Sequence, residues 1–275
     1  MKNFWQTYTL VLLLCTASAF AQVGIGTAYP EGAFDVALGQ AFVYPRITLT
    51  DLNTQTITTP SGGSIETGTM VYNTKNSGTD ENAVYIGLYL WNGSQWIAQF
   101  DKKDNKIFVQ NASARTGHEV GQQGISFDLK TFTPKYYGAY KISVTVHFGA
   151  GQVDLPLTAN PDDQYTNFNA QEGSFSFSFN NQNHSIGLKS FSGNNDDKLF
   201  DGGVFKVYEN SYNQAQFSLV ETTLEAGVAY DFDLTFDQLI AEGFISDGAF
   251  NTDGSGHITL NDAIGCTVEI NYIGN

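Results

Sequence analysis

The sequence is poor in cysteine and in positive charge. It has 2 cysteines, Cys15 and Cys266, among 275 residues, and the first lies in a segment that we expect to be removed. The cysteine left behind forms no disulfide within the chain, so packing must stabilise the fold. Lys and Arg number 13 against 28 Asp and Glu, and the net charge of −15 repels phosphate backbones. We therefore expect no nucleic-acid partner.

Long apolar runs are missing as well. A bilayer span takes about 20 consecutive apolar residues, and no stretch of this sequence is that long. The apolar residues 10–14 follow Lys2 and precede small residues that end at Ala21, which is the pattern of a secretory signal peptide in residues 1–21. Lipid attachment at Cys15 is less favoured, because three leucines precede it. We expect an exported chain from Gln22 onward, without a transmembrane segment.

Motifs of catalysis are also lacking. The sequence contains no G-x-S-x-G elbow, no H-E-x-x-H and no phosphate-binding glycine loop. Cys266 is predicted to be a buried small side chain rather than a reactive thiol. Asp231 and Asp233 share a strand face and could hydrolyse glycosides as a carboxylate pair, but a solvated polar face is the simpler interpretation. We predict that the protein is not an enzyme.

The chain is rich in glycine and aromatic residues, with 28 Gly, 21 Phe and 14 Tyr, a composition typical of strands joined by tight turns. Apolar and polar residues alternate strictly in four segments, which predicts half-buried antiparallel strands. These segments are residues 140–148, 174–179, 228–236 and 264–272. Only residues 236–243 could form a helical turn. The pattern predicts an all-β protein.

Composition divides the chain into parts. After the signal peptide we expect a small β module in residues 22–104, in which Asn92-Gly93 lies between two apolar runs and predicts a β-hairpin. Residues 105–124 are polar and become glycine-rich, which predicts a linker or the lead-in to a second domain. Residues 125–275 carry the alternating segments and form the predicted β-sandwich.

The order of motifs in the first module resembles a recurrent segment of secreted proteins from Gram-negative bacteria. The motifs are VGIGT (23–27), Pro30, AFDV (33–36), YPRITL (44–49), MVYNT (70–74) and LWNGSQW (90–96). Similar segments occur in proteins that look like fibre or surface modules. The resemblance implies a protein that is secreted or lies on the extracellular surface of a Gram-negative bacterium.

The C-terminal domain resembles the jelly roll of complement globular heads and tumour necrosis factor relatives. The resemblance rests on two stretches, FDLKTFTPKYYGAYKISVTVHF (127–148) and TLEAGVAYDFDL (223–234). It implies an antiparallel jelly-roll sandwich that assembles as a homotrimer.

One loop resembles a calcium site in the spacing of its oxygen ligands. An EF-hand loop takes ligands from positions 1, 3, 5, 7, 9 and 12 and needs glycine at position 6. Counted from residue 251, these ligands are Asn251, Asp253, Ser255, the His257 carbonyl, Thr259 and Asp262. The following residues alternate as a strand, so a helix-loop-helix is excluded and a plain turn is favoured. Calcium is still the cofactor that the sequence suggests best.

Aromatic residues near turns suggest sugar contacts, because flat rings can stack on pyranose faces. The candidates are Trp91 and Trp96 beside the Asn92-Gly93 turn, and Tyr136 and Tyr137 before Gly138. Cross-strand packing within a hairpin is the alternative. The favoured function is a non-catalytic, trimeric fibre- or head-like module for recognition of a glycan or surface protein, or for assembly, outside the cell. A calcium-dependent carbohydrate-binding protein is the alternative, and a glycan-active enzyme the second alternative.

Overall fold

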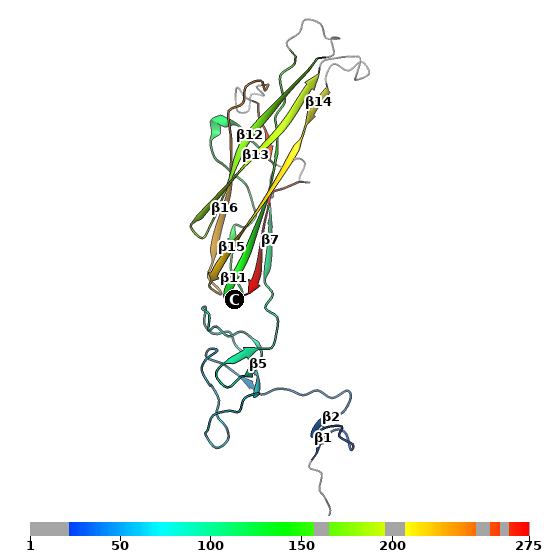
Figure 1. The fold of residues 1–275 in the computed structure, drawn as a ribbon, viewed down its shortest axis with the longest axis vertical. Helices are drawn as coiled ribbons and strands as arrows, with labels where there is room; N and C mark the ends of the chain where they lie inside the picture. The colour runs from blue at the N-terminus through cyan, green and yellow to red at the C-terminus, as the bar shows by residue number, and fades with distance from the viewer. Residues whose placement is uncertain (1–21, 157–164, 196–206, 246–253, 259–263, 275) are drawn as a thin grey trace, which may run out of the picture.

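The computed structural model describes residues 22–156, 165–195, 207–245, 254–258 and 264–274. Within these residues the only helical element is the 3-10 turn η1 (His118–Val120), which confirms the all-β prediction. The molecule is elongated: a long sandwich lies at one end, a small β module follows, and a short strand pair extends beyond the module (Figure 1).

Two antiparallel sheets form the sandwich. The first sheet has the strand order β10 (Thr131–Phe132), β16 (Tyr230–Gln238), β12 (Thr166–Phe179), β13 (Gln182–Asn195) and β14 (Val207–Asn210), and β9 (Gln123–Gly124) also pairs with β16. The second has the order β7 (Asn105–Val109), β18 (Thr267–Gly274), β11 (Gly138–Gly149), β17 (His257–Ile258) and β8 (Ala114–Arg115), and β15 (Tyr212–Leu224) also pairs with β11. The chain changes sheet repeatedly from β10 to β18, which is the connectivity of a jelly roll.

The sandwich core is built from the alternating residues that the sequence indicates. On β11 every second side chain from Tyr140 to Phe148 is fully buried. Phe175 and Phe236 face each other from β12 and β16 with ring centroids 4.5 Å apart, and Phe148 lies 4.7 Å from Phe236. Burying one such side chain contributes about 1.5–3 kcal/mol. The Phe175–Phe236 contact lies within the first sheet, and the Phe148–Phe236 contact packs the second sheet against it.

Two local predictions are wrong. Of the two alternatives for residues 105–124, the linker is wrong, because β7 pairs with β18 over five residues and β9 pairs with β16, so the stretch leads into the sandwich. The segment looks polar because β7 is an edge strand on which only Phe108 is buried. Residues 236–243 contain no helical turn, because Phe236 to Gln238 continue β16 and Leu239 donates a backbone hydrogen bond to Glu172 of the adjacent strand.

The N-terminal module contains one four-stranded sheet, with the order β3 (Arg46–Ile47), β4 (Met70–Asn73), β5 (Gly87–Trp91) and β6 (Trp96–Ala98). The predicted hairpin joins β5 and β6 through residues 92–95. Its turn is held by the Asn92 side chain, which accepts hydrogen bonds from the N–H groups of Ser94 and Gln95. Gly93 has φ 102°, a conformation that glycine adopts without strain.

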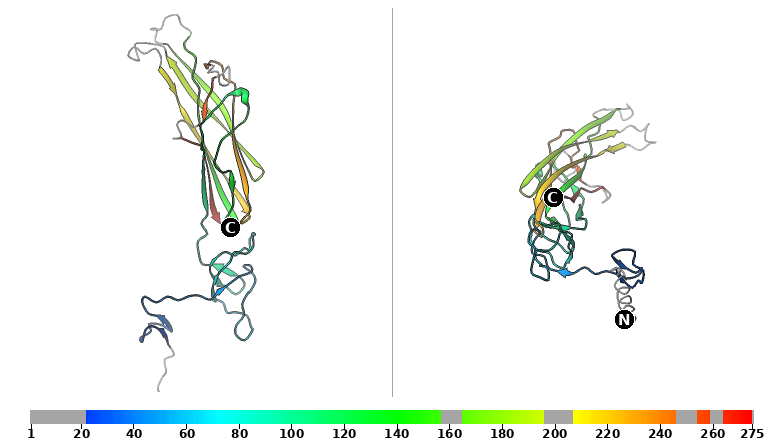
Figure 2. Two further views of the ribbon diagram at one scale, coloured as in Figure 1. Left: turned by 180° about the vertical axis from the view of Figure 1, so that it is seen from behind. Right: turned by 60° about the horizontal axis from the view of Figure 1, so that its bottom comes forward.

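Residues 22–43, here called the N-terminal arm, precede this sheet. They contain β1 (Val23–Ile25) and β2 (Phe34–Val36), which pair in parallel. The arm extends away from both the module and the sandwich (Figure 2).

A cluster of aromatic side chains joins the module to the sandwich. Tyr85 of the module packs edge-on against Tyr136 with ring centroids 4.8 Å apart, and its hydroxyl accepts a hydrogen bond from the Tyr137 N–H at 2.7 Å. The Ala226 N–H donates to the Thr79 carbonyl at 3.0 Å. These contacts make a packed joint rather than a flexible linker.

Candidate functional site

The predicted calcium loop is only partly described. Asn251, Asp253, Thr259 and Asp262 lie outside the described residues, while Ser255 is buried and His257 begins β17. The positive φ in this half of the loop belongs to Gly254, at 66°, whereas an EF-hand needs its sharp turn at the sixth position. In the part of the chain that the structure describes, no three metal-binding side chains cluster. Calcium binding stays a prediction.

Buried amides hold the described end of this loop. The Gln238 Oε1 accepts hydrogen bonds from the Gly256 N–H at 3.2 Å and the Thr116 hydroxyl at 2.5 Å. The side-chain amides of Gln171 and Gln238 both donate to the Gly254 carbonyl. Residues 254–256 are therefore anchored in the sandwich interior, independently of any ligand.

Three of the four proposed sugar-stacking rings are buried, which corrects that prediction. Trp96 is inaccessible and donates its indole N–H to the Thr54 carbonyl at 3.0 Å. Trp91 packs edge-on against Trp96 at 5.2 Å, and Tyr136 lies in the joint against Tyr85. Their faces are covered by protein, as expected from cross-strand packing. Only the half-exposed Tyr137 keeps part of its surface accessible.

Asp231 and Asp233 lie on the exposed face of β16, and each has a protein partner. The Thr131 hydroxyl donates to Asp231, and the Lys130 ammonium pairs with Asp233, both at 2.5 Å. A solvated strand face with cross-strand partners accounts for both carboxylates. Cys266 is fully buried, and burial raises the pKa of its thiol to about 12, so the thiolate that would react is disfavoured.

The module sheet is apolar on both faces, which the sequence analysis did not detect. Residues directly opposite each other in register share a face. Val71 and Tyr89 are such a pair on the inner face, which belongs to a core with Leu49, Trp91 and Trp96. The opposite side, here called the outer face, carries Arg46, Met70, Tyr72, Leu88, Leu90 and Ile97.

Apart from β3, which pairs in parallel with β4, the module sheet is antiparallel, and such a sheet normally places polar residues on a face that is open to water. On the outer face the side chains are instead mostly apolar, and they are partly exposed. Tyr72 is 39% accessible. An apolar face of this kind marks a contact surface.

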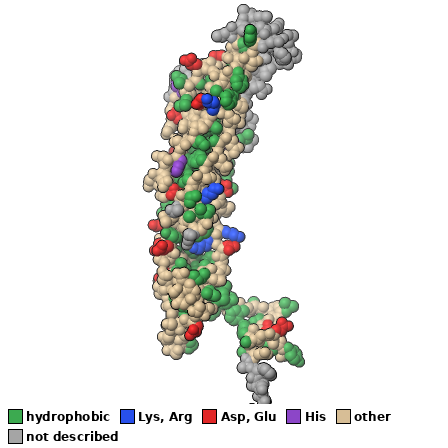
Figure 3. Space-filling view, in the orientation of Figure 1, with side chains coloured by type: hydrophobic (Ala, Val, Ile, Leu, Met, Phe, Trp, Pro, Cys, Tyr) green, Lys and Arg blue, Asp and Glu red, His purple; other side chains and the backbone are tan. Residues whose placement is uncertain are grey.

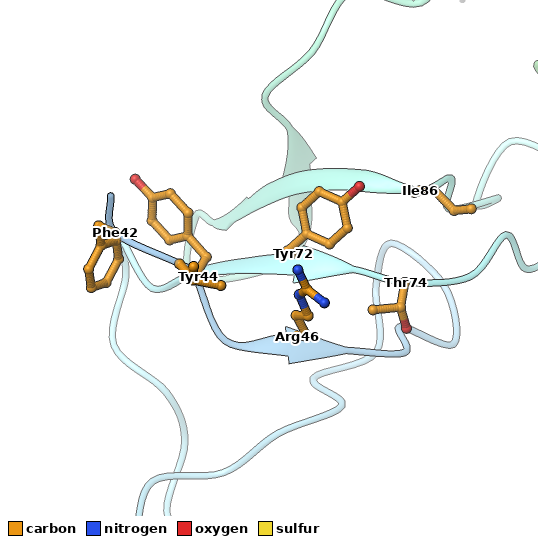
Figure 4. Close-up of a pocket in the computed structure, with 7 residues that line it drawn as sticks. Phe42, Tyr44, Arg46, Tyr72, Thr74 and Ile86 are labelled. Carbon is orange, nitrogen blue, oxygen red and sulfur yellow. The ribbon is translucent and has the colours of Figure 1, made fainter. Parts of the chain in front are cut away.

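An open groove of about 470 Å³ adjoins the outer face. Figure 4 shows Tyr72 and Arg46 side by side on neighbouring strands, Ile86 and Thr74 toward one end, and Phe42 and Tyr44 toward the other. Ile86 is 53% accessible. The groove thus combines apolar and aromatic walls with one cation, Arg46.

The N-terminal arm is also apolar and exposed. Hydrophobic side chains gather over its surface in the space-filling view (Figure 3). The exposed large hydrophobic residues of the arm are Val23, Ile25, Tyr29, Phe34, Leu38, Phe42 and Val43. Apolar residues therefore lie exposed on both the arm and the outer face.

Comparison with known families places these surfaces in one region. Residues 24–112 match the family model of a phage tail-like trimerisation region. The match covers nearly all of the arm, the module sheet and β7, and leaves the rest of the sandwich unmatched. It indicates a homo-oligomeric, fibre-like structural region, in agreement with the fibre resemblance of the N-terminal motifs.

No curated protein matches the chain. The family match does not reach the two stretches on which the resemblance to complement heads rests, so that resemblance stays a prediction. No helix in the described ranges is long and apolar enough to span a membrane.

Proposed function

We propose that the protein is a non-catalytic, trimeric module of an extracellular fibre or surface appendage. Residues 22–104 associate three chains, and the jelly roll forms a head that recognises a glycan or surface protein, or assembles with another component, outside the cell. The observation that carries the proposal is the coincidence of the trimerisation-region match with the exposed apolar arm and outer face. A region that associates chains needs apolar surface left uncovered in the single chain.

The joint between module and sandwich supports a fibre-like role. Tyr85, Tyr136 and Ala226 are all buried where the two parts meet. A packed, hydrogen-bonded joint keeps the head in a fixed direction relative to the associating region. In a trimer, three such heads would project together from one end.

Location outside a Gram-negative cell is part of the proposal. It is supported by the signal-peptide pattern of residues 1–21 and by the fibre-module motifs. Calcium at the 251–262 loop is compatible with this location, because extracellular sites need only weak affinity, with dissociation constants of about 10⁻⁴–10⁻³ M.

The mass of residues 22–275 in solution tests the proposal. Light scattering after gel filtration is expected to give three times the chain mass at every concentration at which the protein is soluble. The same mass in excess chelator would show that association does not depend on calcium. A single-chain mass at the highest concentration would reject the trimeric module.

A further inference from the structure

We propose that the N-terminal arm of one copy covers the outer face and groove of a neighbouring copy. This inference rests on the proposed function, because it names the surfaces through which the trimer forms. It concerns the arm, residues 22–43, and the surface around Tyr72 and Ile86.

The arm lacks a core of its own. Its two strands pair in parallel over three residues each, and an isolated two-stranded ribbon is at best marginally stable in water. Phe34 and Phe42 touch edge-on with 5.8 Å between centroids, yet both remain more than half exposed, and Tyr29 is 89% accessible. A segment with this much exposed apolar surface needs a partner to hold it in one conformation.

Phe42 and Val43, at the end of the arm, line the groove of their own chain, but residues 22–41 extend away from the module (Figure 2). The arm's backbone hydrogen bonds within the described residues, from Val23 to Ala33, Ala37 to Ile25 and Gln40 to Ala37, all stay inside the arm. The chain first bonds to the module at Pro45, whose carbonyl accepts from Tyr72. In both views of Figure 2 the arm points away from the module sheet.

The outer face and groove fit the arm in chemistry. Both surfaces are apolar, so their contact removes apolar area from water on each side. The charged residues of the arm are Glu31 and Asp35, while the groove contributes Arg46. The charges are therefore complementary between arm and groove.

The geometry also suits a closed assembly. Arm and outer face are different surfaces, so a contact between them is heterologous and passes from one copy to the next. Such contacts close into a ring when the rotation between copies is a simple fraction of a turn. Three copies would then each give one arm and receive another, which matches a trimerisation region.

Charged substitutions in the groove test the contact. In residues 22–275, Tyr72→Glu and Ile86→Glu are expected to lower the mass from three chains to one. The same is expected of a chain that begins at Phe42, which keeps the arm residues that line its own groove. Ile240→Glu, at a position 73% accessible on the sandwich, is the matched control and should stay trimeric. Trimer mass in the shortened chain, or in both groove variants, would overturn the inference and leave the trimeric module standing. A single-chain mass in the unmodified protein would reject the proposed function itself.

Cross-linking distinguishes exchange between copies from folding back. One chain carries Leu38→Cys and the other Ile86→Cys, and the two are co-expressed and treated with a short bismaleimide. Cys266 is buried and does not compete. We expect linked dimers only when both chains are present. A further chain carries both cysteines. A link that forms only within this chain would show that the arm folds onto its own copy.

Discussion

Tyr85 connects the module to the sandwich, so its removal should uncouple their unfolding. Its ring packs against Tyr136, its hydroxyl accepts from the Tyr137 N–H, and the Lys102 ammonium lies 5.4 Å from its ring centroid. Tyr85 is only 4% accessible. We expect the Tyr85→Ala variant to retain both folded parts and to lose the joint between them.

The size of the effect follows from these contacts. Truncating a buried aromatic side chain to alanine costs about 3–5 kcal/mol. The edge-on ring pair accounts for about 0.5–1.5 kcal/mol of this, and the Tyr137 N–H left without an acceptor for about 1–3 kcal/mol. Tyr85→Phe keeps the ring and loses only the hydroxyl, so its loss should stay within about 1–3 kcal/mol.

Two probes follow the two parts separately. Trp91 and Trp96 are the tryptophans of residues 22–275, and both lie in the module core. Cys266 is the single cysteine of that range and is buried in the sandwich. Tryptophan fluorescence in urea therefore reports the module, and the reaction of the thiol with a disulfide reagent reports the sandwich.

In the unmodified chain the two urea midpoints should coincide. In Tyr85→Ala the fluorescence midpoint should fall below that of thiol exposure. Chain concentration must be held fixed, because association adds to apparent stability. Leu129→Ala, at a position 52% accessible, is the control and should change neither midpoint. Coincident, unshifted midpoints in Tyr85→Ala would refute the packed joint.

Three further outcomes are expected. Cys266, whose pKa burial raises to about 12, should react with the disulfide reagent at pH 8 only after unfolding. A hydrogen bond from Thr54 lowers the pKa of Asp51 below 3.8. In urea titrations, Asp51→Asn should therefore lower the unfolding free energy above pH 3.8, and its difference from the unmodified chain should disappear as the pH falls through the folded-state pKa. Gly173→Ala would place a Cβ 2.0 Å from the Phe236 ring, so unfolding free energy should fall by about 1–3 kcal/mol, and an unchanged urea midpoint would contradict this.

Alternation along the sequence predicted the sandwich strands well, because successive side chains of a strand point to opposite faces and the apolar ones therefore face the core. Phe232 and Leu234 are buried while Asp233 between them faces water, as expected. The same reasoning missed β7, whose pairing partner, β18, lies about 160 residues later in the chain. Pairing with so distant a strand leaves no local signal.

The candidate site shows the same limit. The hairpin at Asn92-Gly93 could be predicted, because its turn depends on local residues. Its tryptophans looked available for a ligand, and only the packing of the module core and the hydrogen bond to the Thr54 carbonyl show that Trp96 is internal. The calcium-like spacing of residues 251–262 is likewise a local pattern whose ligands would have to converge in space.

By itself the sequence determined the all-β class, the phase of the main strands, the turn at Asn92 and the burial of Cys266. Each depends on residues close together in the sequence, whose relative positions are fixed by the local backbone geometry. The tertiary structure alone decided that the module sheet has a second apolar face and that the arm has no core. Both properties depend on which strands lie beside one another, since an apolar residue such as Tyr72 or Leu38 is a core residue or a contact residue only according to what covers it.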